Sequence, residues 1–287
     1  MPFHSQIANI SPHCQSFELK ITVNLSITAP TRQNWSLFVI FLRREFTGQY
    51  LGSVTSVGWA LLAPLAMLGI YGFVFGQIFK VRFPEADAVG FLGYLALGMW
   101  PWIAFSESVN RAIKAVKGNA ALVHKTALPH EIFVYSTVLA TFLTHLAGYA
   151  VVLLVLALMG KPLIWFMLPV VIYHMFLVLL LAAGLGLIVA ALDVFLNDVE
   201  HGIPLLLTMW FFSTPILYSP SLLPARVIPY LDLNPMAYIV VNIRQAMLEG
   251  RWAPTWIDAA ALIASVAVLL FGRWFFNRCS PRFEDFL

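Results

Sequence analysis

Three acidic residues, Asp193, Asp198 and Glu200, stand close together where a long apolar stretch gives way to polar sequence. Carboxylates grouped at a membrane surface can hold a divalent cation and, through it, a sugar nucleotide. This grouping is the basis of one hypothesis, a membrane-embedded glycosyltransferase or phosphotransferase. The sequence shows no Ser/His/Asp set and no Cys/His cluster with metal-ligand spacing. We therefore predict no catalytic site of those kinds and no metal bound through such a cluster.

The sequence also lacks a recognisable site for nucleotide phosphates. In the pattern G-x-x-x-x-G-K-[ST], backbone amides of a glycine-rich loop surround the phosphates. The one Gly-Lys pair, Gly160-Lys161, is followed by Pro162 and does not fit this pattern. No dinucleotide-binding fingerprint follows a strand. We therefore expect no cofactor in this chain.

A few polar side chains fall inside apolar stretches, where each is a functional candidate because burial in lipid is costly. Glu107 and Arg111 have the i,i+4 spacing of a helical ion pair, and the simplest interpretation is that they neutralise each other. His145 and His174 are interpreted as hydrogen-bonded packing residues, with a proton relay as the alternative. No series of acidic residues crosses the apolar region, which argues against a proton-coupled pump.

The composition indicates that these residues are positioned by helices in a bilayer. Of the 287 residues, 60% are hydrophobic and 11% are charged, whereas soluble domains carry about 25% charged residues. A helix needs roughly 20 apolar residues to cross the hydrocarbon core. The sequence predicts an all-α membrane protein with six transmembrane helices, at about residues 54–79, 89–109, 132–159, 163–192, 203–218 and 256–276.

Three further segments are too polar or too short to span. Residues 1–32 are polar and mixed, which predicts a disordered or weakly ordered cytoplasmic tail and no signal peptide. Residues 33–53 combine aromatics such as Trp35 with arginines such as Arg44, which predicts an amphipathic helix at the membrane interface; a helix packed on a soluble domain is the alternative. Residues 219–255 are proline-rich and predict short re-entrant or external helices between spans five and six.

The placement of Lys and Arg predicts the orientation. Six spans put both termini on one side, and eleven of the 17 Lys and Arg residues fall on that side. Because cytoplasmic loops are enriched in Lys and Arg, both termini are predicted to be cytoplasmic. We expect membrane lipids as partners and no nucleic acid. Cys14 and Cys279 are interpreted as incidental thiols.

Aromatic residues make up 14% of the chain and gather near the predicted span ends. Their simplest role is the aromatic belt at the membrane interfaces. The alternative is a stacking surface for sugar rings, whose C–H faces suit flat aromatic faces. The candidates for such a channel or glycan contact are Phe73, Phe75, Trp100, Trp102, Phe105, Trp210, Phe211 and Phe212.

The loop over residues 111–131 is basic and contains a helical pattern. Such a segment predicts a helix between spans that docks on a partner. Binding of anionic lipid headgroups is the competing interpretation.

A series of short motifs, in order over residues 33–287, resembles the permease subunits of ABC-2 type exporters. The likeness is to the branch that exports capsule, O-antigen and teichoic-acid polysaccharides. It differs at Asn197, where the family more often has Arg. The residues that carry it are Arg43-Arg44-Glu45, Tyr50-Leu51-Gly52-Ser53, Gly58-Trp59, Pro64, Phe75, Phe79, Gly98, Trp102, Phe105, Ser106, Asn119, Leu122, Lys125, Pro129, Glu131, Asn197-Asp198-Val199, Asn234-Pro235-Met236 and Arg244.

The resemblance implies one ABC-2 type transmembrane domain over residues 33–287 of a transport subunit in the bacterial inner membrane. Two copies of the chain would form a homodimeric channel for lipid-linked polysaccharide. Two copies of a separate ABC ATPase would supply ATP and Mg²⁺, and the proline-rich segment would gate the far side. A drug or small-molecule exporter of the same superfamily is the alternative. The residues expected to couple to the ATPase are Arg111, Lys114, Asn119, Leu122, Lys125, Pro129, Glu131 and Asp198.

Overall fold

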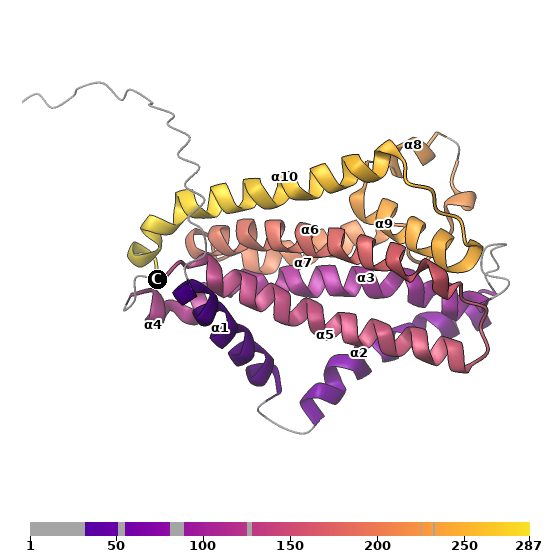
Figure 1. Ribbon diagram of the computed structural model, residues 1–287, viewed down its shortest axis with the longest axis horizontal. Helices are drawn as coiled ribbons and strands as arrows, with labels where there is room; N and C mark the ends of the chain where they lie inside the picture. Colours follow the sequence, from indigo (N-terminus) through magenta and orange to yellow (C-terminus); the bar gives the residue numbers. More distant parts are fainter. Residues whose placement is uncertain (1–31, 51–54, 81–88, 125–127, 225, 232) are drawn as a thin grey trace, which may run out of the picture.

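The structure, a computed structural model, describes residues 32–50, 55–80, 89–124, 128–224, 226–231 and 233–287 (Figure 1). Within these residues every regular element is a helix. The α-helices are α1 (Arg32–Tyr50), α2 (Thr55–Phe73), α3 (Gly90–Ile113), α4 (Ala120–Val123), α5 (Glu131–Leu158), α6 (Leu168–Phe195), α7 (Val199–Ser213), α8 (Ile228–Leu231), α9 (Pro235–Arg244) and α10 (Trp256–Cys279). The predicted tail lies, apart from Arg32, outside the described residues.

Within the described residues, length and hydropathy identify three helical segments that can cross a membrane, Glu131–Leu158, Trp165–Phe195 and Trp256–Asp285. They have 28, 31 and 30 residues, and at about 1.5 Å per residue each exceeds the roughly 30 Å thickness of the hydrocarbon core. Three of the six predicted spans are confirmed in this sense, as is the all-helical class for the described residues. The other predicted spans correspond to α2, α3 and α7, and the count of six stays a prediction.

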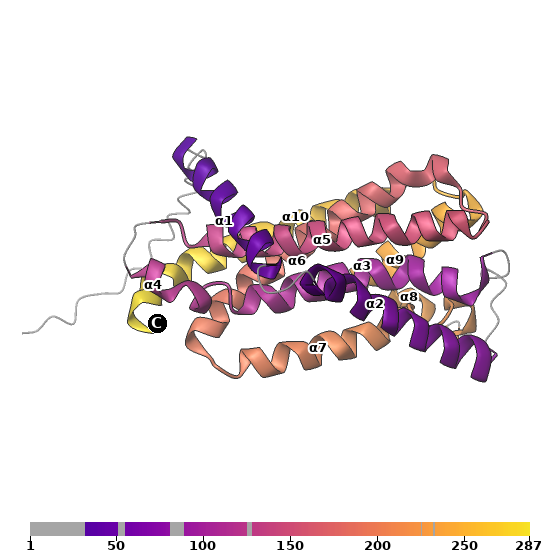
Figure 2. The same ribbon diagram turned by 90° about the horizontal axis from the view of Figure 1, so that it is seen from below.

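Helix α6 lies at the centre of the bundle, between α10 on one side and α3 and α5 on the other (Figures 1 and 2). The α6 and α10 backbones approach each other closely at Gly184 and Gly272. A Cβ atom on Gly184 would lie 2.7 Å from the backbone of Val268. Membrane helices associate largely through such close packing of small residues, because lipid gives apolar side chains little reason to cluster.

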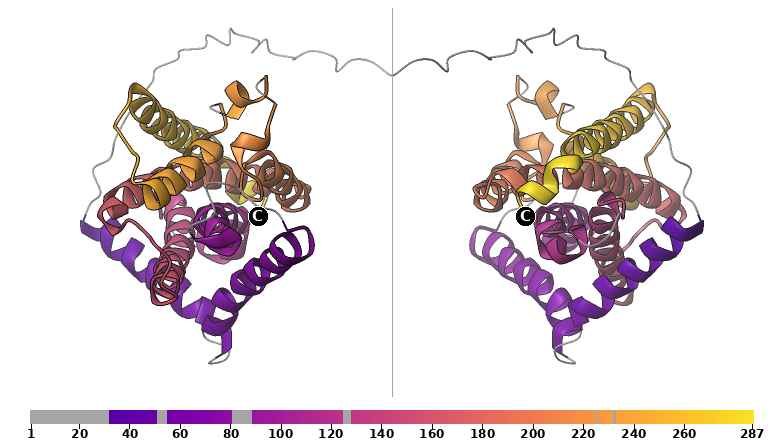
Figure 3. Two further views of the ribbon diagram at one scale, coloured as in Figure 1. Left: turned by 90° about the vertical axis from the view of Figure 1, so that its right-hand side faces the viewer. Right: turned by 90° about the vertical axis from the view of Figure 1, so that its left-hand side faces the viewer.

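Helix α1 lies at an angle to the bundle, and α1 and α2 form the two arms of a V on one side of the packed helices (Figures 1 and 3). The inner face of α1 packs on α5 through Phe41, whose ring meets Phe133 edge-on at 5.0 Å. Its outer face leaves Trp35 and Ile40 62% and 60% exposed. An apolar outer face on a helix beside the bundle is what an interfacial position requires, although the membrane position of α1 itself stays a prediction.

The predicted fifth span, 203–218, overlaps α7 without coinciding with it. Helix α7 begins at Val199 and ends at Ser213. Pro215 has no N–H to continue the helix, and the chain bends after Ser213. The carbonyl groups of Pro215 and Ile216 are used elsewhere, as hydrogen-bond acceptors for a buried arginine.

That arginine, Arg244 at the end of α9, is 4% exposed. Its Nε donates to the carbonyl of Tyr94 on α3 at 3.0 Å, and its Nη2 donates to the carbonyl of Ile216 at 2.7 Å. The guanidinium also stacks on the Tyr94 ring, with Cζ 3.7 Å from the ring centre. A planar guanidinium with five donors suits several carbonyl acceptors at once. Arg244 therefore ties α9 and the bend after α7 to α3.

Gly98 on α3 provides the room for this arginine. A Cβ atom at position 98 would lie 2.7 Å from Arg244 Cζ and 2.8 Å from Val240 Cγ1. Any side chain at this position would displace the guanidinium from its carbonyl partners.

Replacing Gly98 with alanine should therefore destabilise the bundle, since overpacking a well-packed site costs about 1–3 kcal/mol. We expect a lower midpoint of thermal unfolding in detergent, followed by tryptophan fluorescence. Gly202→Ala on α7 is the matched control, because nothing lies within 4 Å of a Cβ atom there. A Gly98→Ala protein that melts like the Gly202→Ala control would contradict the role given to Arg244.

Candidate functional site

Most of the aromatic candidates come together between α3 and α7. The Trp102 ring lies 5.7 Å from Phe211, and the Phe105 ring meets Trp210 edge-on at 5.2 Å. Phe212 adjoins Phe211 at 5.3 Å. Aromatic pairs at these distances favour edge-to-face or offset geometry. The result is a continuous aromatic wall built from two helices.

Trp210 is fixed in this wall by a hydrogen bond from Nε1 to Oδ1 of Asn234, at 2.8 Å. The same amide oxygen accepts from the backbone N–H groups of Met236 and Ala237 and so caps the start of α9. Asn is among the preferred N-cap residues because its side chain satisfies these free N–H groups. The aromatic wall and the short helix α9 are therefore positioned by one residue.

A cavity of about 450 Å³, here called the aromatic groove, opens beside this wall between α2, α3 and α7. Its apolar lining is joined by polar groups from α3 and α7. Helix α2 closes it on the third side. Its lining residues are Met67 and Tyr71 from α2, Met99, Trp102, Ile103, Ser106, Glu107 and Asn110 from α3, and Pro204, Leu207, Thr208, Phe211 and Phe212 from α7.

A second cavity of about 740 Å³, here called the basic pocket, lies further along α3 toward its C-terminal end. It is lined by Arg44 and Glu45 from α1, by Arg111, and by Lys114 and Asn119 after α3. Glu107 and Asn110 line both cavities. These two residues therefore stand where the aromatic groove meets the basic pocket.

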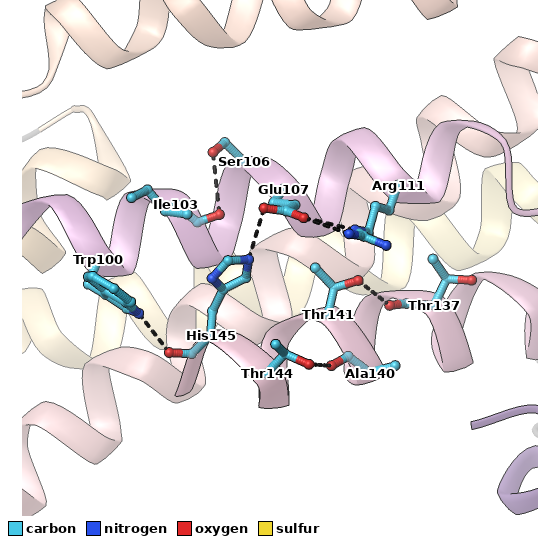
Figure 4. A network of polar contacts seen from close by, with 10 residues as sticks. All are labelled: Trp100, Ile103, Ser106, Glu107, Arg111, Thr137, Ala140, Thr141, Thr144 and His145. Atoms are coloured by element: carbon cyan, nitrogen blue, oxygen red, sulfur yellow. Dashed lines mark hydrogen bonds and ion pairs between the residues drawn. The ribbon is translucent and has the colours of Figure 1, made fainter. Parts of the chain in front are cut away.

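Glu107 is held from two helices (Figure 4). Its Oε1 accepts from Nε of Arg111 at 2.9 Å, which confirms the i,i+4 pair expected from the sequence. Its Oε2 lies 3.0 Å from Nε2 of His145 on α5. The backbone carbonyl of His145 in turn accepts from Nε1 of Trp100 at 2.8 Å. The contact between Glu107 and His145 gave no sequence signal, since the two residues are 38 positions apart.

The other aromatic candidates lie elsewhere. Trp100 is fully buried and uses its N–H on α5, so it does not line the groove. Phe73 is 61% exposed on the surface of α2. Phe75 packs among the rings of Phe79 and Phe91. The sequence did not separate these residues from the groove-lining ones, because hydropathy does not report which face of a helix a ring occupies.

Two of the three acidic residues singled out in the sequence, Asp193 and Glu200, pair with lysines that follow α3. Lys114 forms an ion pair with Glu200, and its hydrogen bond and charge hold the pKa of Glu200 below the usual value. Lys117 Nζ lies 3.2 Å from Asp193 Oδ2 and donates to Asn197 Oδ1 at 2.8 Å. These contacts tie the loop after α3 to the turn between α6 and α7.

Asp193 and Glu200 therefore have lysine partners, which weakens the case for a cation held between them. Within the described part of the chain, no group of three His, Cys, Asp or Glu side chains is placed to hold a metal ion. Asp198, the third acid of the group, is exposed at the start of α7.

The residues expected to couple to an ATPase differ in how exposed they are. Arg111 and Lys114 are exposed, while Leu122 and Pro129 are half-buried. Asn119 accepts from Nη2 of Arg44 at 2.6 Å, which joins α1 to the loop after α3. Lys125 lies outside the described residues.

Glu131 is engaged within the chain. Both of its carboxylate oxygens accept from Arg273 of α10, at 3.1 and 3.2 Å. A bidentate pair of this kind is strong and directional. The Glu131 side chain is 16% exposed, so its geometry favours a tie between α5 and α10 over a contact with another protein.

The C-terminal turn Ser280–Asp285 packs at the same end of the bundle. Phe283 is fully buried, with its ring 5.2 Å from Phe276 and 5.9 Å from Phe195. His130, just before α5, lies 6.0 Å from the same ring. The chain end therefore supports the loops that carry the coupling candidates, a contact that the sequence did not indicate.

Comparison with known proteins bears on this architecture. The profile of the ABC-2 type transporter family matches residues 36–248. The O-antigen export system permease protein RfbA of Klebsiella pneumoniae is 24% identical over 256 residues, covering 88% of this chain and 95% of the relative. The protein of the same name from Myxococcus xanthus is 28% identical and covers 83% and 88%. The polysialic acid transport protein KpsM of Escherichia coli is 27% identical and covers 75% and 81%.

The matched region includes the helices that line both cavities, and the match extends over most of the chain. The chain belongs to the ABC-2 type transporter family.

Proposed function

We propose that this chain is the transmembrane permease subunit of an ATP-driven exporter that moves lipid-linked polysaccharide across the bacterial inner membrane. The observation that carries the proposal is the junction of the aromatic groove with the basic pocket at Glu107 and Asn110. Apolar sites with a few placed polar groups are typical of ligand binding. The relatives named for O-antigen export and for polysialic acid transport support polysaccharide as the cargo.

The two cavities suit the two parts of a lipid-linked glycan. Aromatic faces such as those of Phe211 and Phe212 can stack on sugar rings. Arg44, Arg111 and Lys114 can bind the phosphate of a lipid carrier, since charge-assisted hydrogen bonds to phosphate are strong. Helix α1, which supplies Arg44 to the basic pocket, lies beside the bundle, where a lipid could approach from the membrane.

The proposal includes a homodimer. Met67 and Phe212 line the groove yet are 46% and 59% exposed. Exposed apolar surface of this kind is a candidate for contact with another chain. A second copy facing α2 and α7 would cover these side chains and complete a channel.

The proposal also includes six spans with both termini in the cytoplasm. The loop after α3, the turn between α6 and α7, and the C-terminal segment lie at one end of the bundle (Figure 1). This end carries Arg111, Lys114 and Lys117, which supports a cytoplasmic assignment.

Two copies of a separate ABC ATPase, carrying ATP and Mg²⁺, would dock on this end. The exposed side chains of Arg111, Lys114 and Asp198 are the best placed contacts. Motion there would reach the groove through α3, because Arg111 is bonded to Glu107 at the junction of the cavities.

The division of labour between the two subunits predicts that the purified chain releases no phosphate from ATP, since its sequence has no phosphate-binding loop. Reconstituted with its ABC ATPase, the complex should hydrolyse ATP and move lipid-linked glycan into vesicles. An ATPase with its phosphate-binding lysine replaced is the control and should abolish both activities. Hydrolysis by the pure chain would contradict the proposal.

The position of the groove predicts that replacing Phe212 lowers glycan export more than replacing Phe73, although both side chains are exposed. Phe212→Leu should lower export by about 2- to 10-fold, because an aromatic contact contributes about 0.5–1.5 kcal/mol beyond its area. Phe73→Leu is the matched control, since Phe73 is 61% exposed against 59% for Phe212 and lies outside the groove. Transport into vesicles by the reconstituted complex provides the measurement. Equal effects of the two substitutions on glycan export would count against the groove as the glycan path. If the complex instead transports drugs, and Phe212→Leu lowers drug transport but not glycan export, a small-molecule exporter would be favoured.

A further inference from the structure

We propose that an apolar crevice beside α1 binds one zwitterionic phospholipid of the surrounding bilayer, of the phosphatidylethanolamine class. One acyl chain would lie in the crevice, and the headgroup would meet the ion pair of Glu131 and Arg273. The lipid would be part of the folded protein and not its cargo, so this inference does not depend on glycan export.

The crevice lies between α1, α5, α6 and α10 and has a volume of about 500 Å³. Leu139 of α5, Leu180 of α6 and Leu269 of α10 line it together with Trp35 and Phe38 of α1. This volume falls within the range of sites that hold small molecules. The crevice is separate from the aromatic groove and from the basic pocket, because it shares no lining residue with either.

The crevice follows the long helices from one end into their apolar part. Glu131 is the first residue of α5, and Leu139 lies about 12 Å further along the helix. Leu139, Leu180 and Leu269 are half-buried, so the crevice is open along its length to the surroundings of the bundle. Because α5, α6 and α10 are long and apolar enough to cross a membrane, we take these surroundings to be lipid.

An acyl chain is the occupant that these surroundings offer. Water in the crevice would need several polar partners. Among the described lining residues, however, the charged and hydroxyl groups of Glu131, Tyr135 and Arg273 lie together at one end. An empty crevice would deprive its walls of van der Waals contacts, which an acyl chain supplies. Because lipid tails are as apolar as leucine, a preference for one lipid over another must come from the headgroup.

The polar end of the crevice offers donors to a phosphate group. Nε and Nη2 of Arg273 donate to Glu131, whereas Nη1 has no hydrogen-bond partner within the described residues and is not buried. The hydroxyl of Tyr135, one turn after Glu131, is likewise unburied and without such a partner in the described part of the chain. Arginine binds phosphate through strong, charge-assisted hydrogen bonds. Nη1 and the Tyr135 hydroxyl can therefore hold the phosphate of a lipid whose chain lies in the crevice.

The charge of this end distinguishes between lipid classes. Glu131 neutralises Arg273, so the pair has no net charge with which to attract an anionic lipid. It presents an anionic and a cationic group side by side, which is complementary to a headgroup that carries both a phosphate and an ammonium group. The phosphate would meet Nη1 of Arg273, and the ammonium group would lie toward the Glu131 carboxylate. Phosphatidylglycerol would make the first contact only.

The proposed homodimer leaves the crevice free. Figure 2 shows α7 on the opposite side of the bundle from α1 and α5. A second copy that faces α2 and α7 would therefore not cover the crevice. The bound chain would lie against Trp35 and Phe38 of α1, the helix that also supplies Arg44 to the basic pocket. The lipid would help to hold that helix on the bundle.

Native mass spectrometry of the full-length chain tests the proposal. The purified chain is mixed in detergent with equal amounts of palmitoyl-oleoyl phosphatidylethanolamine and palmitoyl-oleoyl phosphatidylglycerol. We expect one phospholipid to be retained per chain. Phosphatidylethanolamine should be retained about 2- to 5-fold more often than phosphatidylglycerol, the ratio that one exposed ion pair provides.

Filling the crevice should remove the lipid. Leu139→Trp places a large ring where the acyl chain would lie and should abolish specific retention. Leu154→Trp is the matched control, because it makes the same change on α5 at a side chain that is 57% exposed and outside the crevice. Leu180→Trp fills the crevice from α6 and serves where Leu139→Trp does not fold.

Changing the charge of the pair should change the lipid that is preferred. Glu131→Gln keeps an acceptor for Arg273 but leaves the positive charge uncompensated, so phosphatidylglycerol should then be retained in preference to phosphatidylethanolamine. Glu249→Gln removes the same charge from a residue that is paired with Arg251 outside the crevice, and it should leave the preference as it was.

Two results would overturn the proposal. The first is the absence of retained lipid on the unaltered chain, or equal retention by the variants with tryptophan inside and outside the crevice. The second is equal retention of the two lipids, unchanged by Glu131→Gln. Neither result depends on whether the complex exports glycan, so the proposed function would stand or fall separately.

Discussion

The arrangement of the two cavities depends on the hydrogen bonds that the Glu107 carboxylate makes with Arg111 and His145. The carboxylate joins Arg111 on its own helix to His145 on α5, and the carbonyl of His145 receives the N–H of Trp100 from α3. These bonds hold α3 and α5 together at the level where the aromatic groove meets the basic pocket. A charged group at such a place in a membrane protein is costly to bury, so two partners that satisfy it fix both its position and its direction.

Arg244 and Asn234, in the segment before α10, hold the part of the site that lies farther from Glu107. Arg244 is bonded to carbonyl groups of α3 and of the bend after α7, which satisfies backbone acceptors that a broken helix would otherwise leave free. Asn234 caps α9 and holds the indole of Trp210. The aromatic wall is therefore not independent of this segment, and a movement of α9 would reach Trp210 directly.

The long apolar helices could be predicted because crossing a bilayer imposes length and hydropathy on the sequence. The three clearest spans begin or end within a few residues of their predicted limits. The predicted fifth span runs past the end of α7, since residues 214–218 continue the hydropathy signal although backbone carbonyls there accept hydrogen bonds from Arg244. Patterns of apolar residues do not report such a change in backbone direction.

The site was only partly predictable for a related reason. Aromatic candidates were chosen by type and position along a span, and that choice includes residues that face the groove, such as Trp102, and residues that do not, such as Trp100. The partners of Glu107 and Glu131 lie 38 and 142 positions away in the sequence. Pairs so far apart carry no local spacing, whereas Glu107 and Arg111, one turn apart, could be predicted.

The central claim is that glycan passes along the aromatic groove, and crosslinking during export tests it most directly. A photoreactive phenylalanine analogue would replace Phe212, which lines the groove, or Phe176 of α6, which is 49% exposed and outside it. Irradiation of cells or vesicles during active export should attach glycan at position 212 and not at position 176. Attachment at neither position, or equally at both, would contradict the account.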